Sequence, residues 1–312
     1  MTHSLHRKRP LPWFETPDMI APDEPGRAEK VIPWLPLIAA PLAVLIFARG
    51  IQPWAFMWLL AFAIFFGCKW LTWWPARTRM SAPRALGYLF AWPGMDARPF
   101  ERTLLPPPPG RTAAREWGAA IFKTAFGATL IWILARRLPP LPGMWAGMAG
   151  ILLVLHFGVF HLLALMWRRA GVDVTPIMRA PGLATSLADF WSARWNLAFR
   201  TLAHETVLRP LQRRLGLHGA LFAVYLVSGL IHELVISLPA GAGYGLPTAY
   251  FLLQWLGLNV ERSHFGRRAG LHHGLAGWAF MLLITAGPAY WLFHPAFVQR
   301  VIVPFFQTIG AL

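Results

Sequence analysis

The stretch GMWAGMAGILLVLHFGVFHLLALMW, residues 143–167, contains no Asp, Glu, Lys or Arg. An α-helix rises 1.5 Å per residue, so about 20 apolar residues cross the roughly 30 Å hydrocarbon core of a bilayer. This stretch is therefore predicted to be a transmembrane helix. Six further apolar runs are predicted to behave in the same way, and the seven expected spans are 31–48, 52–68, 117–135, 143–167, 219–238, 246–258 and 271–293. The sixth run is short and can be a tilted, re-entrant or half-buried segment.

The overall composition agrees with a membrane protein. The chain has 312 residues, of which 56% are hydrophobic and 13% charged, which is too apolar for an ordinary soluble domain. We therefore expect an all-α, polytopic transmembrane bundle of about seven or eight spans, with amphipathic helices on the cytosolic side. Residues 31–312 are expected to form one membrane-embedded domain. Residues 1–30 are expected to be a flexible cytoplasmic arm, because the basic residues of HRKRP precede no apolar core and do not indicate a signal peptide.

The formal net charge is +16, and the positions of the Lys and Arg residues along the chain follow the predicted topology. Alternate segments outside the predicted spans carry 24 and 4 Lys and Arg residues, and one more lies inside a span. This asymmetry follows the positive-inside rule and predicts a cytoplasmic N-terminus. The charge is explained by topology and anionic lipid headgroups, so it requires no nucleic-acid partner. Arg outnumbers Lys 25 to 4, which suggests a GC-rich bacterial genome and hence a bacterial inner membrane.

The segment DFWSARWN, residues 189–196, is unusual in so apolar a chain. A helix from about Thr185 to Leu215 is predicted here. At 100° per residue this helix has a polar face and an opposite apolar face. The polar face contains Asp189, Ser192, Asn196 and Arg200. The apolar face contains Leu187, Trp191, Trp195, Phe199 and Leu202. One interpretation is an interfacial helix with tryptophans at the headgroup level. The neutral amide of Asn196 adds nothing to anchoring but can donate a hydrogen bond to a carbonyl, which favours a functional site.

A second polar group lies in YLVSGLIHELVIS, residues 225–237. His232 and Glu233 are inside a predicted span, where ionisable residues are costly and commonly functional. The alternative is a histidine hydrogen-bonded in the bundle interior. The face of His232 is shared by Tyr225, Ser228, Gly229 and Ile236. Glu233 points about 100° away from His232, and it either pairs with a neighbouring helix or orients the site.

The other histidines do not have the spacing of a metal site. His156 and His161 are five residues apart, which separates them by about 140° around a helix. The motif H-E-x-x-H requires a second histidine where this chain has Ile236. No metal site is predicted.

The two motifs together resemble a known family. DFWSARWN followed by SGLIHEL is similar to the signature pair of the membrane-bound O-acyltransferases, in particular the wax synthase-like branch. The resemblance covers best about residues 175–240, and GYLFAWPGMD at 87–96 adds weaker similarity. It implies an MBOAT-like fold that transfers an acyl group from acyl-CoA to a hydroxyl, with no cofactor besides acyl-CoA as co-substrate. The resemblance makes Asn196 and His232 the active-site pair. Ala193 departs from the basic residue that the plant-like phrase often has, so acyl-chain length and acceptor stay open.

On this basis His232 is expected to act as general base towards the acceptor hydroxyl, and Asn196 to hydrogen-bond the reacting carbonyl. Arg194, Arg200 and neighbouring residues of the cytosolic segment 168–218 are expected to hold the phosphates of the coenzyme. Trp191 or Trp195 is expected to support its adenine or to line the mouth of the tunnel through the membrane that the resemblance implies. The predicted substrate-binding residues are Asp189, Trp191, Arg194, Trp195, Arg200, Ser228 and Glu233. The expected partners are acyl-CoA, a lipophilic alcohol and membrane lipids. Sterol, terpenoid or secondary-metabolite acceptors are alternatives, as is a small multi-pass transporter.

Overall fold

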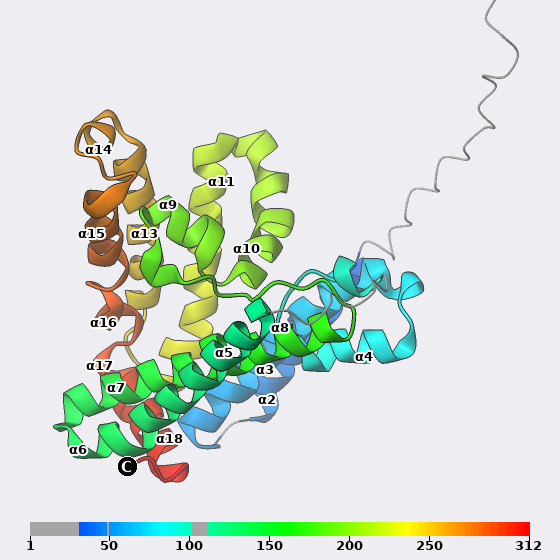
Figure 1. Cartoon of the computed structure of the whole chain (residues 1–312), viewed down its shortest axis with the longest axis horizontal. Coiled ribbons are helices and arrows are strands. Elements are labelled where there is room, and N and C mark those ends of the chain that lie inside the picture. Colours follow the sequence, from blue (N-terminus) through cyan, green and yellow to red (C-terminus); the bar gives the residue numbers. More distant parts are fainter. Residues whose placement is uncertain (1–30, 49, 102–110) are drawn as a thin grey trace, which may run out of the picture.

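The computed structural model of the chain describes residues 31–48, 50–101 and 111–312 (Figure 1). The predicted N-terminal arm, residues 1–30, lies outside the described residues. Within the described ranges all regular structure is helical and no β-strand occurs, so the predicted all-α class is confirmed.

The predicted spans all fall on helices. Five helices are long and apolar enough to cross a membrane, namely Pro53–Arg79, Ala114–Arg137, Pro140–Arg169, Leu197–Ala240 and Gly274–Leu292. The remaining two predicted spans correspond to a shorter apolar helix, Ile32–Phe47, and to α13, Leu246–Arg262. The polytopic membrane class is therefore confirmed, while the count of seven or eight spans stays a prediction.

The helices are often joined end to end by single π-helical turns, for example at Leu153–Val159 and Glu233–Ser237. The α-helices are α2 (Leu35–Phe47), α3 (Pro53–Trp73), α4 (Ala82–Ala91), α5 (Arg111–Thr129), α6 (Ala135–Arg137), α7 (Pro140–Leu152), α8 (Phe160–Arg169), α9 (Leu187–Asp189), α10 (Leu197–Ala203), α11 (Arg209–His232), α12 (Leu238–Ala240), α13 (Leu246–Arg262), α14 (His264–Arg268), α15 (Gly274–Thr285), α16 (Ala289–Leu292), α17 (Pro295–Phe297) and α18 (Val303–Thr308).

The helices form two groups (Figure 1). One group contains α2, α3, α5, α7, α8 and α18 and lies obliquely at the bottom of the view. The other contains α9, α11, α13, α14, α15 and α16 and stands above it. Close packing of α2 with α3, of α5 with α7 and of α11 with α13 holds the groups together internally. The start of α3 and the C-terminal residues 297–311 share a core with the end of the α11 span, which connects the two groups.

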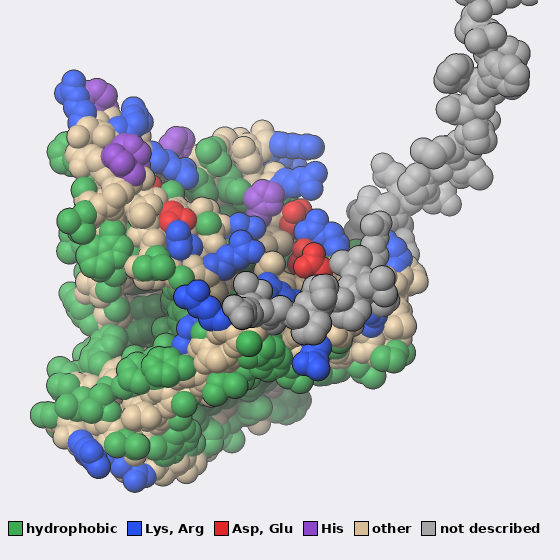
Figure 2. Space-filling model, viewed as in Figure 1, with side chains coloured by type: hydrophobic (Ala, Val, Ile, Leu, Met, Phe, Trp, Pro, Cys, Tyr) green, Lys and Arg blue, Asp and Glu red, His purple; other side chains and the backbone are tan. Residues whose placement is uncertain are grey.

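Charge and apolar side chains are separated on the surface. Lys and Arg gather at the upper ends of α11 and α14 and in a band across the middle of the face in Figure 2, while the lower group is mostly apolar. Many large apolar side chains are exposed, for example Phe122 at 67% and Leu283 at 67%. Such exposure is expected where helices meet lipid rather than water.

The helices α11 and α13 approach each other very closely at Gly229. A Cβ atom at this position would lie 2.7 Å from the Cα of Thr248. Small residues commonly mediate such contacts between membrane helices, because they let the backbones come together. This contact sets the position of α13 beside the part of α11 that carries His232.

One apolar element was absent from the predicted spans. Residues 295–308, which form α17, a π-helical turn and α18, place Val301 and Phe306 fully in the core. They pack with Met57 of α3 and Ile236 of the α11 span. The segment is shorter than a membrane span, which is why a search for runs of about 20 apolar residues did not detect it.

The stretch GYLFAWPGMD closes around a buried lysine. Lys69, at the end of α3, is 0% exposed. Its ammonium group donates to the Gly94 carbonyl oxygen at 2.6 Å and lies 3.1 Å from the centre of the Tyr88 ring. These two contacts fix the stretch after α4 to the end of the α3 span, since a buried charge needs such partners.

The predicted continuous helix from Thr185 to Leu215 is wrong. The chain leaves helical geometry at Trp195, which is extended, and at Asn196, which has φ 42° and ψ 59°. The chain also leaves helical geometry at Gly216, just past the predicted end and inside the range of α11, with φ 67° and ψ 179°. The sorting of DFWSARWN into two faces of one helix therefore does not hold beyond Arg194.

Candidate functional site

The DFWSARWN motif is held by a neighbouring extended segment, residues 177–179. The amide of Leu197 donates to the Ile177 carbonyl at 2.9 Å, and the amide of Arg179 donates to the Arg194 carbonyl at 2.8 Å. The amide of Asn196 donates to the sulfur of Met178 at 3.3 Å. These contacts satisfy the backbone groups that the helix break would otherwise leave unpaired.

Asn196 is the N-cap residue of α10. Its left-handed backbone conformation is one that asparagine tolerates better than most residues. Its side-chain oxygen accepts from the Phe199 amide at 3.5 Å, as is typical of a helix N-cap. The amide nitrogen of this half-buried side chain donates to none of the described residues. The cap therefore orients the side chain and leaves two N–H donors available to a ligand.

His232 is fixed by one hydrogen bond on its own helix. Its Nδ1 atom lies 2.7 Å from the Ser228 carbonyl oxygen, which can only accept, so Nδ1 carries a proton. In the neutral imidazole Nε2 is then the atom with a free lone pair. Nε2 has no hydrogen-bond partner in the described part of the chain and is not among the buried unpaired polar atoms. The ring contacts Phe251 of α13, with 4.4 Å between the ring centres.

Aromatic contacts connect the motif to His232. Trp191 contacts both Tyr225 of α11 and Phe251 of α13, with ring centres 5.9 Å and 6.1 Å apart. Phe251 in turn contacts His232. The two predicted motifs thus meet at one side of α13.

The flanks of Asn196 reach the same region. Trp195 and Phe199, on either side of the asparagine, pack in one hydrophobic cluster with Ile231, the neighbour of His232. The structure therefore packs the flanks of Asn196 and of His232 into a common cluster.

Two buried polar residues of α13 position the motif, and the sequence analysis missed both. Gln254 is 0% exposed. Its oxygen accepts from the Trp191 indole at 3.3 Å, and its nitrogen donates to the Ile284 carbonyl at 2.8 Å. It therefore ties the motif to α13 and to α15.

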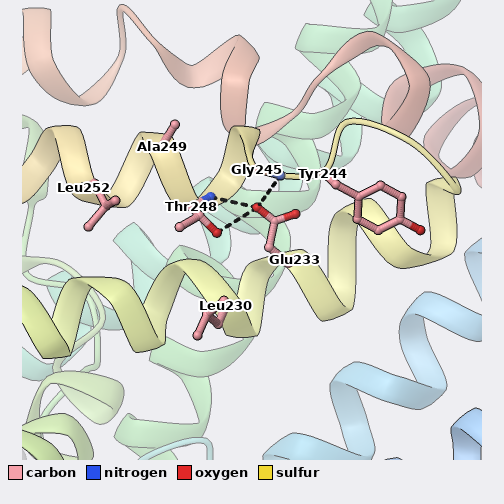
Figure 3. Close-up of a pocket in the computed structure, with 7 residues that line it drawn as sticks. All are labelled: Leu230, Glu233, Tyr244, Gly245, Thr248, Ala249 and Leu252. Carbon is pink, nitrogen blue, oxygen red and sulfur yellow. Dashed lines mark hydrogen bonds between the residues drawn. The ribbon is translucent and has the colours of Figure 1, made fainter.

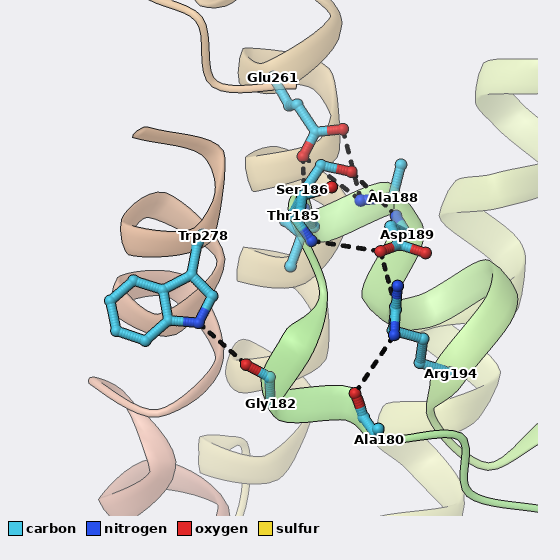
Figure 4. Close-up of polar contacts among 10 residues, drawn as sticks. Ala180, Gly182, Thr185, Ser186, Ala188, Asp189, Arg194, Glu261 and Trp278 are labelled. Carbon is cyan, nitrogen blue, oxygen red and sulfur yellow. Dashed lines mark hydrogen bonds and ion pairs between the residues drawn. The ribbon is translucent and has the colours of Figure 1, made fainter. Parts of the chain in front are cut away.

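Glu261 is the second residue, at 2% exposed (Figure 4). One of its oxygens accepts from the Leu187 amide at 2.6 Å, and both oxygens lie 3.3 Å from the Ala188 amide. A carboxylate at this place accepts hydrogen bonds from the first N–H groups of α9 and interacts favourably with the positive end of the helix dipole. Ser186 completes the cap by accepting from the Asp189 amide at 3.0 Å.

The sequence did contain a signal for this pair. Gln254 and Glu261 are seven residues apart, which places them on one face of a helix within a largely apolar run. They lie on the side of α13 that also contributes Phe251.

The charged residues of the motif mainly contact the motif itself. Asp189 accepts from the Nε atom of Arg194 at 2.7 Å and from the Thr185 amide at 3.2 Å. Arg194 also donates to the Ala180 carbonyl at 3.4 Å (Figure 4), and Arg200 donates to the Ser192 carbonyl. These contacts close the loop before and after the π-helical turn. Phosphate binding by the two arginines stays a prediction.

The structure separates the roles of the remaining predicted residues. The hydroxyl of Ser228 donates to the Val224 carbonyl at 2.9 Å, so Ser228 serves His232 through its backbone oxygen. Glu233 pairs with the neighbouring helix. One of its oxygens accepts from the Gly245 amide at 3.0 Å and, at 3.0 Å and 2.8 Å, from the amide and hydroxyl of Thr248.

Comparison with known proteins agrees with the two motifs. The profile of the membrane bound O-acyl transferase family matches residues 174–253, a range that contains both. A probable long-chain-alcohol O-fatty-acyltransferase 2 from Arabidopsis thaliana is 38% identical over 153 residues, which cover 44% of this chain and 43% of the relative. The long-chain-alcohol O-fatty-acyltransferase of Simmondsia chinensis is 30% identical over 144 residues, covering 42% and 40%. An acyl-CoA–sterol O-acyltransferase 1 from Arabidopsis thaliana is 37% identical over 71 residues, covering 20% and 21%.

The matches span less than half of the length of these relatives. The apolar helices and the family profile support a membrane protein. The relatives are plant proteins and give no support to the expected bacterial inner membrane. The resemblance carried by the two motifs is confirmed: residues 174–253 match the profile of the membrane bound O-acyl transferase family, and similar proteins include long-chain-alcohol O-fatty-acyltransferases.

Proposed function

We propose that the chain is an integral membrane O-acyltransferase that moves an acyl group from acyl-CoA to the hydroxyl of a long-chain alcohol. The observation that carries the proposal is the hydrogen bond from Nδ1 of His232 to the Ser228 carbonyl, which leaves Nε2 as a base. The names of the relatives from Arabidopsis thaliana and Simmondsia chinensis supply the class of acceptor.

In the proposed reaction Nε2 of His232 accepts the hydroxyl proton of the alcohol as its oxygen attacks the carbonyl carbon of the thioester. The new C–O bond forms and the C–S bond breaks. The proton on the imidazolium then passes to the departing thiolate, so the products are an ester and free coenzyme A. The imidazole returns to its starting state.

Asn196 is proposed to donate from its free amide nitrogen to the thioester oxygen as negative charge develops on it. The N-cap contact with Phe199 holds the amide in one orientation, which is the condition for effective stabilisation of an oxyanion. Loss of a single donor of this kind typically lowers the rate by about 10² to 10³.

Acyl-CoA is proposed to approach from the cytosolic side. In the proposed topology this side carries the two long basic segments between spans, 69–116 and 168–218. Arg194 and Arg200 of the second loop would contact its phosphates, and Trp191 or Trp195 its adenine or the acyl chain. The basic band in Figure 2 is consistent with this approach. Residues 31–312 would act as one catalytic domain.

The test is to incubate membranes that contain the protein with labelled acyl-CoA and separate acceptors: a long-chain primary alcohol, a sterol and a terpenoid alcohol. We expect a labelled ester and an equal amount of free coenzyme A thiol, with the long-chain alcohol as the best acceptor. Preference for the sterol would instead indicate the acceptor class named for the sterol O-acyltransferase relative. Flux of labelled lipid without any ester would support a transporter and contradict the proposal.

A further inference from the structure

The turn that joins α13 to α15 forms a basic surface. This turn, residues 262–275 and here called the α14 hairpin, contains three arginines and no Asp or Glu. The side chains of Arg262, Arg267 and Arg268 are all exposed. Figure 2 shows basic side chains gathered at the upper end of α14. The hairpin therefore presents positive charge to its surroundings, with no acidic side chain of its own to balance it.

The same surface has exposed apolar side chains. Phe265 is 69% exposed and Leu275 is 78% exposed. Apolar side chains among basic ones are typical of segments at a membrane surface, where the apolar groups enter the headgroup region and the cations contact lipid phosphates. The position in the fold agrees, because a candidate membrane span, Gly274–Leu292, begins at the end of the hairpin.

The hairpin has a defined structure. α14 packs so closely on the end of α13 that a Cβ atom at Gly266 would lie 2.2 Å from the Val260 carbonyl oxygen. The hydroxyl of Ser263 caps α14 by accepting from the Gly266 amide at 3.0 Å, and the Leu271 amide donates to the Gly266 carbonyl at 2.9 Å. The arginines of α14 are therefore attached to a backbone that is fixed on α13.

Both helices joined by the hairpin contact the segment that leads into the DFWSARWN motif. On the side of α13, Glu261 accepts from the first amides of α9 (Figure 4). On the side of α15, the indole of Trp278 donates to the Gly182 carbonyl at 2.9 Å (Figure 4). A Cβ atom at Gly277 would lie 2.1 Å from the Thr185 carbonyl oxygen. The segment before the motif is thus held between the two helices that the hairpin connects.

The other end of α13 is fixed to the helix that carries His232. The Oε1 atom of Glu233 accepts from the Gly245 amide at 3.0 Å and from the amide and hydroxyl of Thr248 at 3.0 Å and 2.8 Å (Figure 3). These contacts oppose a shift of α13 along α11. Movement of the hairpin would therefore displace the segment before the motif relative to His232.

We propose that the α14 hairpin binds the headgroups of anionic phospholipids, and that this contact holds the segment before the DFWSARWN motif between α13 and α15. The three arginines contact lipid phosphates, while Phe265 and Leu275 enter the interface. The phosphates of acyl-CoA offer the same anionic chemistry, but a coenzyme bound from water would leave the two apolar side chains exposed. A membrane surface complements both the charge and the apolar side chains.

The first experiment tests the binding site. Purified full-length protein is placed in phosphatidylcholine nanodiscs with a trace of phosphatidylglycerol that carries a photoreactive headgroup, and labelled peptides are mapped by mass spectrometry. We expect label on residues 262–278. Unlabelled phosphatidylglycerol should suppress this label, whereas acyl-CoA should not.

Charge variants define the role of the arginines. A triple variant that combines Arg262→Gln, Arg267→Gln and Arg268→Gln should reduce the label on the hairpin at least about fivefold, since one arginine near an anionic surface contributes about this factor. Replacement of the same three residues by lysine, which keeps the charge, should restore the label. Arg136→Gln with Arg137→Gln, at exposed positions on the opposite side in the predicted topology, should leave the label unchanged.

Hydrogen exchange tests the effect on the segment before the motif. Exchange of the Leu187 and Ala188 amides is compared in nanodiscs of phosphatidylcholine alone and of phosphatidylcholine mixed with phosphatidylglycerol. The anionic lipid should slow this exchange at least about fivefold in the unchanged protein and have no effect in the triple variant. Equal exchange in the two lipids would overturn the proposed effect on the segment.

Label that spares residues 262–278, full label in the triple variant, or loss of the label on addition of acyl-CoA would each overturn the lipid site. Neither measurement uses acyl transfer, so the proposal is independent of the proposed function. A protein that labels on the hairpin but makes no ester with any acceptor would support the lipid site and contradict the acyltransferase. A protein that makes ester without label on the hairpin would do the reverse.

Discussion

Glu261→Ala tests whether α13 positions the DFWSARWN motif. The carboxylate of Glu261 is the acceptor for the amides of Leu187 and Ala188 at the start of α9, in a place that is 2% exposed. Alanine leaves both donors without an acceptor, and water reaches this site poorly. The start of α9 is then expected to move or fray, and the motif that follows it to move with it.

The size of the effect follows from these contacts. A buried donor without its partner costs about 1–3 kcal/mol, and removal of a side-chain cap costs about 0.5–2 kcal/mol. Because the contact to Leu187 is short and the contacts to Ala188 are long, we expect the free energy of unfolding to fall by about 2–4 kcal/mol. Glu261→Gln keeps one acceptor oxygen, and a neutral hydrogen bond has roughly half the strength of a charged one, so it should lose about half as much.

The assay is thermal unfolding of the detergent-solubilised protein, together with the rate of ester synthesis below the unfolding temperature. Glu205→Ala is the matched control, because Glu205 is 52% exposed and its contacts are long ones, to Arg209 at 3.4 Å and to His204 at 3.5 Å. It should change the free energy of unfolding by less than about 1 kcal/mol. If Glu261→Ala unfolds and reacts like Glu205→Ala, the positioning role of α13 is refuted.

Three further changes test other parts of the account. Asn196→Gly introduces a residue that tolerates φ 42°, so the free energy of unfolding should change by only a few tenths of a kcal/mol. The rate of acyl transfer, measured as ester formed per folded protein, should fall by about 10² to 10³. An unchanged rate would contradict the role of the amide. Gly229→Val drives a side chain against the backbone of Thr248, so it should destabilise the protein by about 1–3 kcal/mol or more in a thermal melt, where an unchanged melt would contradict the close contact. Trp191→Phe removes the donor to the buried oxygen of Gln254 and should cost about 1–3 kcal/mol in the same assay; a full-stability variant would show that this contact is unimportant.

The membrane helices could be predicted from the sequence because a span requires only a local property, a run of apolar residues long enough to cross the bilayer. Residues 143–167 illustrate this, since they lie within the helix Pro140–Arg169. The C-terminal residues 295–308 show the limit of the same rule. They are too short to be detected as a span, and their burial depends on contacts with Met57 and Ile236, far away in the sequence.

The two motifs were found from the sequence, but the geometry of the first was predicted incorrectly. The prediction placed Asp189 and Asn196 on one face of a continuous helix. The π-helical turn Phe190–Arg194 and the left-handed Asn196 change the direction of the chain between them. This break is stabilised by Ile177 and Met178, whose position depends on the tertiary fold and cannot be obtained from helical periodicity.

The role of α13 was also outside the reach of local reasoning. Its sequence predicts only a short apolar segment, 246–258, yet Phe251 of this helix contacts the ring of His232 and Gln254 accepts a hydrogen bond from Trp191. Two polar residues on one face of an apolar helix indicate a buried partner. Which partners they bind depends on the tertiary fold, and Figure 4 shows this for Glu261 at the start of α9.

The central claim is that Nε2 of His232 accepts the proton of the alcohol, and the most direct test is the rate of ester synthesis in two variants of this residue. His232→Gln can keep the hydrogen bond to the Ser228 carbonyl but has no basic nitrogen, and His232→Ala removes the ring altogether. Both should reduce ester synthesis by about 10² to 10⁴ at unchanged protein content in the membrane. His264→Ala, at an exposed histidine of α14, should react normally. Ester synthesis within a few fold of the unchanged protein in either His232 variant would contradict the mechanism.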